Sequence, residues 1–96
     1  MQIKEITVNG KNYRGFEGEV APGSLLVFIA GKKGFIMCGY LNLETAEKLQ
    51  NIAAVATGVR SVEDMLNTSI VKVTSYAVNA GITIGMPVKE ALEKIY

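Results

Sequence analysis

Histidine is absent from this chain of 96 residues, and cysteine occurs only once, at Cys38. Without histidine the chain cannot form a Ser-His-Asp or Cys-His catalytic pair, and it lacks the commonest protein ligand of transition metals. One cysteine excludes an internal disulfide and leaves too few ligands for a zinc site. No Asp-rich loop suggests a calcium or magnesium site. We therefore expect no metal centre and no cofactor.

Clusters of positive charge are also missing. Ten Lys and Arg residues oppose nine Asp and Glu residues, which gives a net charge of +1. Only two of the basic residues are arginines, and Lys32-Lys33 is the only adjacent basic pair. Proteins that bind nucleic acids concentrate Lys and Arg on one face. The composition therefore predicts no nucleic-acid partner.

Long hydrophobic runs are absent too. The strongly apolar run at residues 25–30 is far too short to cross a bilayer. The first five residues, MQIKE, carry charges and lack the apolar core of a signal peptide. We expect a cytoplasmic protein with no membrane partner.

Apolar residues are nevertheless abundant, at 49% of the chain. Its length suits one domain, residues 1–96, which buries only a modest share of its surface. A monomer of this size would leave much apolar surface in water. We therefore predict a homo-oligomer whose interface is built from core-like residues.

The N-terminal half has the pattern of β-hairpins. Residues 3–8 and 13–20 alternate between apolar and polar, and Asn9-Gly10 between them favours a two-residue hairpin turn. The charges of the second strand suggest a sheet edge. Glu17 and Glu19 share one face of that strand, where they could hold a proton or a metal, but such pairs more often protect an edge strand from aggregation.

After residue 24 the sequence contains continuously apolar segments. Residues 25–30 and 35–41 are apolar apart from Gly39, and residues 31–34 (GKKG) predict a hairpin between them. Continuous apolarity indicates strands covered on both faces, by helices or by a neighbouring subunit. These two segments are the expected central strands.

The C-terminal half predicts short helices. We expect one helix at residues 43–51 after an Asn42 cap, a second that begins with a capping box at Ser61, and a third after Pro87. We also expect a buried strand at residues 52–59 and a short extended segment at residues 82–84. Residues 68–80 combine β-branched residues with helical spacing, and we choose helix. The fold class is α+β: N-terminal antiparallel β-hairpins with buried central strands, packed by three to four short helices in the C-terminal half.

Three stretches resemble one protein family. They are residues 34–42 (GFIMCGYLN), 58–66 (GVRSVEDML) and 81–92 (GITIGMPVKEAL). In this order and spacing they resemble the YunC-like family, domain of unknown function 1805. The resemblance implies a β-rich N-terminal half and a helical C-terminal half, and it implies no activity. Pro87 departs from the small hydroxyl residue expected before the last helix.

Cys38 is the first candidate for chemistry. The adjacent Gly39 would let a ligand or backbone approach closely, and the helix expected after Asn42 could lower the pKa of the thiol. Cys38 would then be a catalytic nucleophile or redox group, while Tyr40 and Asn42 could donate hydrogen bonds to a ligand. The plainer interpretation makes Cys38 a small core residue and Asn42 a helix cap.

Arg60 is the second candidate. It lies between an expected strand and helix, where α/β proteins often bind ligands, and its guanidinium could clamp a small anionic ligand. Glu63 and Asp64 follow at once and would repel a free anion, so Arg60 could instead pair with an acidic residue at a subunit contact.

Two classes of function fit these observations. The first is an oligomeric binding or regulatory module without catalysis of its own. The alternative is a small thiol-dependent enzyme or redox sensor that uses Cys38, with Arg60 as anion clamp. A scaffold role, with the site completed by another protein, is a third possibility. The sequence leaves open whether the protein is an enzyme.

Overall fold

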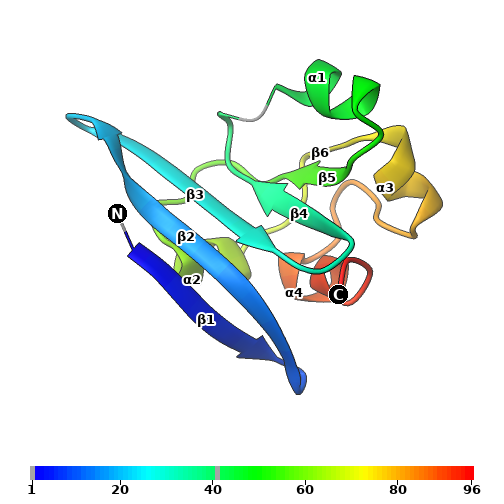
Figure 1. The fold of residues 1–96 in the computed structure, drawn as a ribbon, viewed down its shortest axis with the longest axis horizontal. Coiled ribbons are helices and arrows are strands. Elements are labelled where there is room, and N and C mark those ends of the chain that lie inside the picture. Colours follow the sequence, from blue (N-terminus) through cyan, green and yellow to red (C-terminus); the bar gives the residue numbers. More distant parts are fainter. Residues whose placement is uncertain (1, 41) are drawn as a thin grey trace.

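A six-stranded mixed sheet with four short helices forms the fold, in a computed structural model that describes residues 2–40 and 42–96. The strand order follows the sequence, β1-β2-β3-β4-β5-β6 (Figure 1). The α+β class is therefore confirmed. The elements are β1 (Gln2–Val8), β2 (Lys11–Ala21), β3 (Ser24–Ala30), β4 (Gly34–Met37), α1 (Leu43–Lys48), β5 (Ile52–Val55), α2 (Val62–Leu66), β6 (Lys72–Val73), α3 (Ser75–Asn79) and α4 (Val88–Leu92).

The predicted hairpins are confirmed. Asn9 and Gly10 join β1 to β2 with positive φ angles of 53° and 78°, the conformation that a two-residue hairpin turn requires. Between β3 and β4, the N–H of Gly31 donates to the carbonyl of Gly34 at 2.9 Å. The first four strands are consequently an antiparallel meander.

The next pairing, β4 with β5, is parallel, and Gly34 makes it possible. Gly34 lies opposite Ile52, and a Cβ atom at Gly34 would overlap the carbonyl oxygen of Ile52. The chain returns from β4 to β5 through α1, which begins at the predicted cap: the Asn42 side chain accepts the N–H of Thr45 at 3.1 Å. The carboxyl ends of β4 and β5 therefore meet at the same edge of the sheet.

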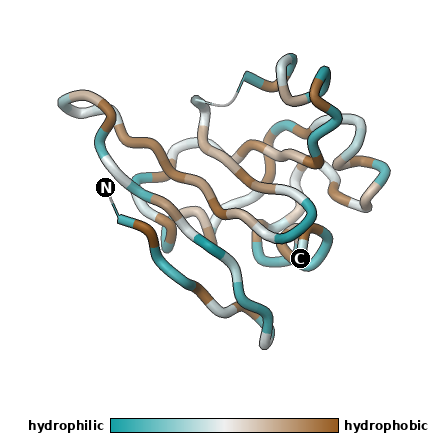
Figure 2. The backbone as a smooth tube through the Cα atoms, viewed as in Figure 1, coloured by the Kyte–Doolittle hydropathy of each residue, from teal (hydrophilic) through white to brown (hydrophobic). Residues whose placement is uncertain are grey.

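Helices cover one face of the sheet and only part of the other. Helix α2 packs on β2 and β3 and α4 on β4, behind the sheet in Figure 1, while α1 and α3 contact β5. Hydrophobic residues run along β3, as Figure 2 shows. The core between the sheet and α2 and α4 includes Ile29, Ile36, Met65, Ile70, Leu92 and Ile95, all buried.

The prediction of one helix over residues 68–80 is wrong. This segment forms the edge strand β6, in which Val73 pairs with Ala54, and then the short helix α3. Thr74 separates them. Its buried hydroxyl donates to the carbonyl of Asn51 at 2.7 Å and accepts the N–H groups of Ala53 and Ala77 at 3.2 Å and 3.1 Å. These contacts with β5 therefore favour a strand followed by a short helix over the single helix that the spacing of apolar residues predicts.

One strand prediction also needs correction. β5 ends at Val55 rather than at Val59, because the chain turns away at Gly58, where φ is +75°. The short extended segment expected at residues 82–84 forms no strand, and only Ile82 within it is buried.

The interpretation of β2 as a sheet edge is wrong as well, because β2 pairs with β1 and β3 on its two sides. Glu17 points to the helical side of the sheet. There it accepts the N–H of Val62, the first residue of α2, at 2.9 Å, and lies 3.3 Å from the Lys4 amine. The Val62 N–H, and then Lys4, hold the pKa of Glu17 below its ordinary value. Glu17 therefore anchors α2 to the sheet.

We predict that the free energy of unfolding depends less on pH in the acid range for Glu17→Gln than for the wild type. The folded carboxylate has a lowered pKa, so its contribution is complete above the ordinary glutamate pKa and is lost as the pH falls toward the folded value. At neutral pH the substitution should cost about 1 kcal/mol, the scale of one charge-assisted hydrogen bond. Urea unfolding between about pH 3 and pH 7 measures both effects.

The matched control is Glu44→Gln, because the Glu44 side chain is 82% exposed on α1. It should keep the wild-type profile. If the free energy of unfolding of Glu17→Gln falls with acid pH as steeply as that of the wild type, the anchoring role is contradicted.

Candidate functional site

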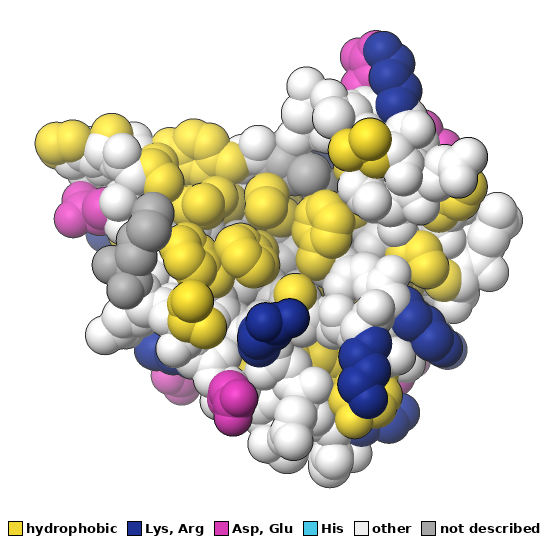
Figure 3. Space-filling model, viewed as in Figure 1, with side chains coloured by type: hydrophobic (Ala, Val, Ile, Leu, Met, Phe, Trp, Pro, Cys, Tyr) yellow, Lys and Arg dark blue, Asp and Glu magenta, His cyan; other side chains and the backbone are white. Residues whose placement is uncertain are grey.

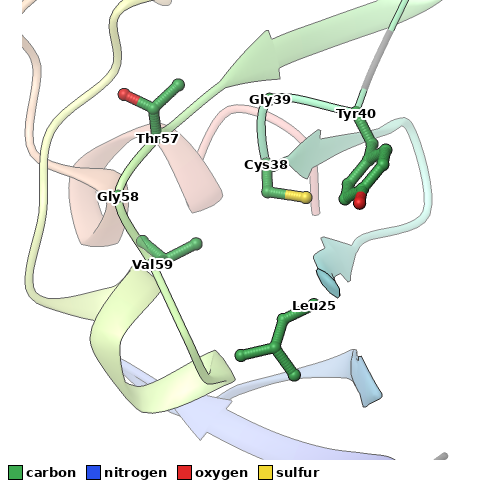
Figure 4. Close-up of a pocket in the computed structure, with 7 residues that line it drawn as sticks. All are labelled: Leu25, Cys38, Gly39, Tyr40, Thr57, Gly58 and Val59. Carbon is green, nitrogen blue, oxygen red and sulfur yellow. The ribbon is translucent and has the colours of Figure 1, made fainter. Parts of the chain in front are cut away.

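A crevice lies where the parallel strands β4 and β5 end. Cys38, Gly39 and Tyr40 follow β4, and residues 57–59 (TGV) follow β5, while Leu25 of β3 forms a third side (Figure 4). The crevice has a volume of about 270 Å³. Ligands of α/β proteins commonly bind outside the carboxyl ends of neighbouring strands. The parallel β4–β5 pairing therefore creates the candidate site.

Two glycines leave this crevice open. A Cβ atom at Gly39 would come no closer than 3.7 Å to Thr57 Cγ2, an ordinary contact. Gly58 has a positive φ of 75°, and a Cβ atom there would meet nothing within 4 Å. A ligand can consequently approach the backbone of both loops.

Backbone N–H groups are the main polar feature of the two loops. Among residues 2–40 and 42–96, the N–H groups of Gly39, Thr57, Gly58 and Val59 donate to no protein acceptor. Of the described residues that line the crevice, none has a charged side chain. Backbone N–H groups gathered in successive loop residues bind the oxygens of carboxylates and phosphates. The loops that border the crevice thus hold four N–H groups without an acceptor among the described residues, and no described lining residue carries a carboxylate.

Cys38 lies at the base of this crevice and extends the β3–β4 pairing. Its N–H donates to the carbonyl of Val27 at 3.0 Å, and its Sγ accepts the N–H of Val27 at 3.4 Å. Only 5% of the residue is exposed. Figure 4 shows the sulfur pointing into the space between Tyr40, Val59 and Leu25. Cys38 therefore hydrogen-bonds to β3 and also lines the crevice.

The family model of the domain of unknown function DUF1805 matches residues 37–95. The chain belongs to this family. The protein YunC of Bacillus subtilis (strain 168), described as uncharacterized, is 36% identical over 78 residues, 77% of each chain. The crystal structure of TA1206 from Thermoplasma acidophilum, titled a protein of unknown function, has a TM-score of 0.93 and 37% identity. That match covers 99% of this chain and 92% of the other.

The family match has a clear boundary in the structure. It begins at the last residue of β4 and includes both loops of the crevice, whereas β1, β2 and β3 lie outside it. The resemblance seen in the sequence is thus confirmed, and the matched region contains all of the crevice except Leu25.

The structure brings together three of the five residues proposed from the sequence. Cys38, Gly39 and Tyr40 line the crevice, and Tyr40 is 55% exposed at its rim. Asn42 does not line it, because its side chain caps α1. Arg60 does not line it either; this exposed residue precedes α2, and its backbone N–H donates to Asp64 Oδ2 at 3.1 Å.

Sequence reasoning missed Leu25 and residues 57–59. The segment 57–59 was included in a strand, which hid a turn that the glycine at position 58 could have signalled. Among the described residues, no three His, Cys, Asp or Glu side chains lie where they could hold a metal ion. No described helix has the length and apolarity to span a membrane.

We predict that Cys38→Ala lowers stability by about 1–3 kcal/mol, because it leaves the buried N–H of Val27 without an acceptor. The Val27 amide should also exchange its hydrogen faster than the other amides of β3. Urea unfolding and amide hydrogen exchange measure these effects.

Val59→Ala is the control, since it removes apolar atoms from the same crevice without removing a hydrogen-bond acceptor. It should leave Val27 exchange unchanged. Equal Val27 exchange in Cys38→Ala and in the wild type would show that the thiol has no such role.

Proposed function

We propose that this protein is a cytoplasmic, single-domain, homo-oligomeric module that binds a small anionic ligand in the crevice and performs no catalysis of its own. The observation that carries the proposal is the set of N–H groups at Gly39, Thr57, Gly58 and Val59 that have no acceptor among the described residues, in loops beside a cavity whose described lining is uncharged. The ligand would be held by its carboxylate or phosphate oxygens.

The size and polarity of the crevice narrow the ligand class. Its volume of about 270 Å³ is below the range of most drug-sized pockets, so a molecule with few heavy atoms fits best. Leu25, Val59 and the Tyr40 ring provide apolar contact on the remaining sides. A small carboxylate with a short apolar part matches this lining.

The absence of a catalytic base supports a binding role. The chain has no histidine, and the described residues of the lining include no Asp, Glu or Lys to move a proton. The Cys38 sulfur already accepts a backbone N–H, and the residue is only 5% exposed. Reactive cysteines are usually accessible and lie in electropositive surroundings.

One observation favours the alternative, a thiol-dependent enzyme or redox sensor: the Cys38 sulfur points into the crevice (Figure 4). In that case the loop N–H groups would stabilise developing negative charge, because Arg60 lies outside the lining. Alkylation by iodoacetamide, followed by intact mass, separates the two proposals. A binding module should label mainly after unfolding, whereas rapid labelling of the native protein at neutral pH would support the alternative.

We predict that acetate and inorganic phosphate, each titrated at constant ionic strength, shift the amide resonances of Gly39, Thr57, Gly58 and Val59. The shifts should saturate together, because one bound anion accepts hydrogen bonds from both loops. Two-dimensional ¹⁵N–¹H NMR of the uniformly labelled protein provides the measurement.

Substitutions at Gly39 supply the matched pair of variants. Gly39→Ala adds a Cβ atom that meets only Thr57 Cγ2 at 3.7 Å, so fold and binding should persist. Gly39→Val adds two further methyl groups next to the loop N–H groups and should weaken binding at least tenfold, about 1.4 kcal/mol. Absence of saturable shifts at these amides, or equal shifts in Gly39→Val, would contradict the proposed site.

A further inference from the structure

The sheet has an open face on the side away from α2 and α4. Directly opposite residues of neighbouring strands share a face, and Ile3 pairs with Phe16, Phe16 with Phe28, and Phe28 with Met37. These four side chains therefore form one apolar row across β1, β2, β3 and β4. Figure 3 shows hydrophobic side chains gathered over these strands, facing the viewer.

The row is partly accessible to solvent, because Ile3 is exposed and Phe16, Phe28 and Met37 are half-buried. Ile3 is 74% exposed, and the rings of Phe16 and Phe28 stack with centroids 5.0 Å apart. A shallow hollow of about 280 Å³ lies beside them, lined also by Arg14 and Ala30. Paired positions place Leu26 and Phe35 on the same face. We call this set of residues the open face: Ile3, Glu5, Arg14, Phe16, Leu26, Phe28, Ala30, Phe35 and Met37.

Two opposite charges lie next to the apolar row. Glu5 of β1 pairs with Arg14 of β2 in the sheet register, so both side chains belong to the open face. Both residues are exposed, and neither forms an ion pair within the described part of the chain. The open face therefore carries one acid and one base, each available to a partner.

We infer that a second copy of this chain covers the open face, in a two-fold symmetric dimer. In such an isologous interface the same patch meets itself, so residue i contacts residue j of the partner and the reverse also holds. Glu5 of one protomer would then pair with Arg14 of the other, twice in each dimer. A patch with one acid, one base and an apolar centre is complementary to itself in charge.

The area of the open face suits this partner. Seven residues of each of β1, β2 and β3 and the four residues of β4, with strands spaced about 4.8 Å apart and residues rising about 3.3 Å, cover roughly 400 Å² as a flat surface. Protruding side chains make the accessible area larger, so two copies together bury on the order of 1,000 Å², the lower bound for a specific interface. Apolar patches of this size are often functional surfaces.

This inference deepens the oligomeric part of the proposed function by naming the surface. Leu25 and Cys38 of the crevice lie on the other side of the sheet, since their registers alternate with those of Leu26 and Met37. Dimerisation through the open face therefore leaves the anion site accessible, and the two proposals can fail separately.

Light scattering coupled to size exclusion tests the inference on the full chain at about 10–100 µM, the range in which a standard interface associates. The wild type should show twice the 10.3 kDa mass of one chain. Phe28→Glu should give a monomer, because it buries an unpaired charge in the apolar row. Ile84→Glu is the matched control: Ile84 is 66% exposed outside the open face, so this variant should remain dimeric.

Charge exchange tests the pairing without altering any apolar side chain. Glu5→Arg and Arg14→Glu should each weaken the dimer at least tenfold, since each places like charges together twice. The double variant, Glu5→Arg with Arg14→Glu, should restore the dimer to within a few-fold of the wild type. Circular dichroism checks the fold of each variant.

A wild type that stays monomeric at all these concentrations would overturn the inference, including a monomer that associates only with a different protein. A dimer that survives Phe28→Glu, or a double variant no tighter than its parents, would overturn it as well. Acetate titration of the Phe28→Glu monomer isolates the other proposal: retained shifts at Gly39 and Gly58 leave the crevice intact whatever the oligomeric result.

Discussion

The parallel pairing of β4 with β5 is the constraint on which the rest of the structure depends. It needs the close approach of Gly34 to the Ile52 carbonyl, which any larger residue would prevent. It also needs a crossover, which α1 provides. If β5 ran antiparallel to β4, residues 38–40 and 57–59 would lie at opposite ends of the sheet. The candidate site therefore follows from the direction of one strand.

The open face exists because the helices cover the two faces of the sheet unequally. α2 and α4 bury one face of β2, β3 and β4, whereas α1 contacts β5 and α3 contacts β5 and β6. The continuous apolarity of β3 is thus met by helices on one face and left open on the other. The candidate crevice at the strand ends and the broad open face are thus separate surfaces of one small protein.

Local signals in the sequence predicted much of the fold. Asn9-Gly10, the Asn42 cap and the Ser61 cap act through neighbouring backbone groups, and the structure confirms each of them. The Asp64 carboxylate accepts the N–H of Arg60 in place of the Ser61 N–H that a full capping box would use. Cys38, Gly39 and Tyr40 were identified because a glycine followed a buried strand. The apolar excess suggested an oligomer but could not indicate which face would be left open.

The errors involve contacts between distant residues. β6 forms because Val73 meets Ala54, and Glu17 gains its role from Val62, which lies 45 positions away. Residues 57–59 lie at the site because β5 pairs in parallel with β4. No local pattern contains these pairings. A parallel register in particular leaves no turn signal, because the two strands are joined through a helix.

The most direct test of the account is a crystal structure of the protein soaked in sodium bromide, with the ions located by their anomalous scattering. If the crevice binds anions, a bromide will lie in it, within hydrogen-bonding distance of the N–H groups of Gly39 and of at least one of Thr57, Gly58 and Val59. Bromide bound elsewhere on the surface, with the crevice empty, would contradict the claim that this site binds anions.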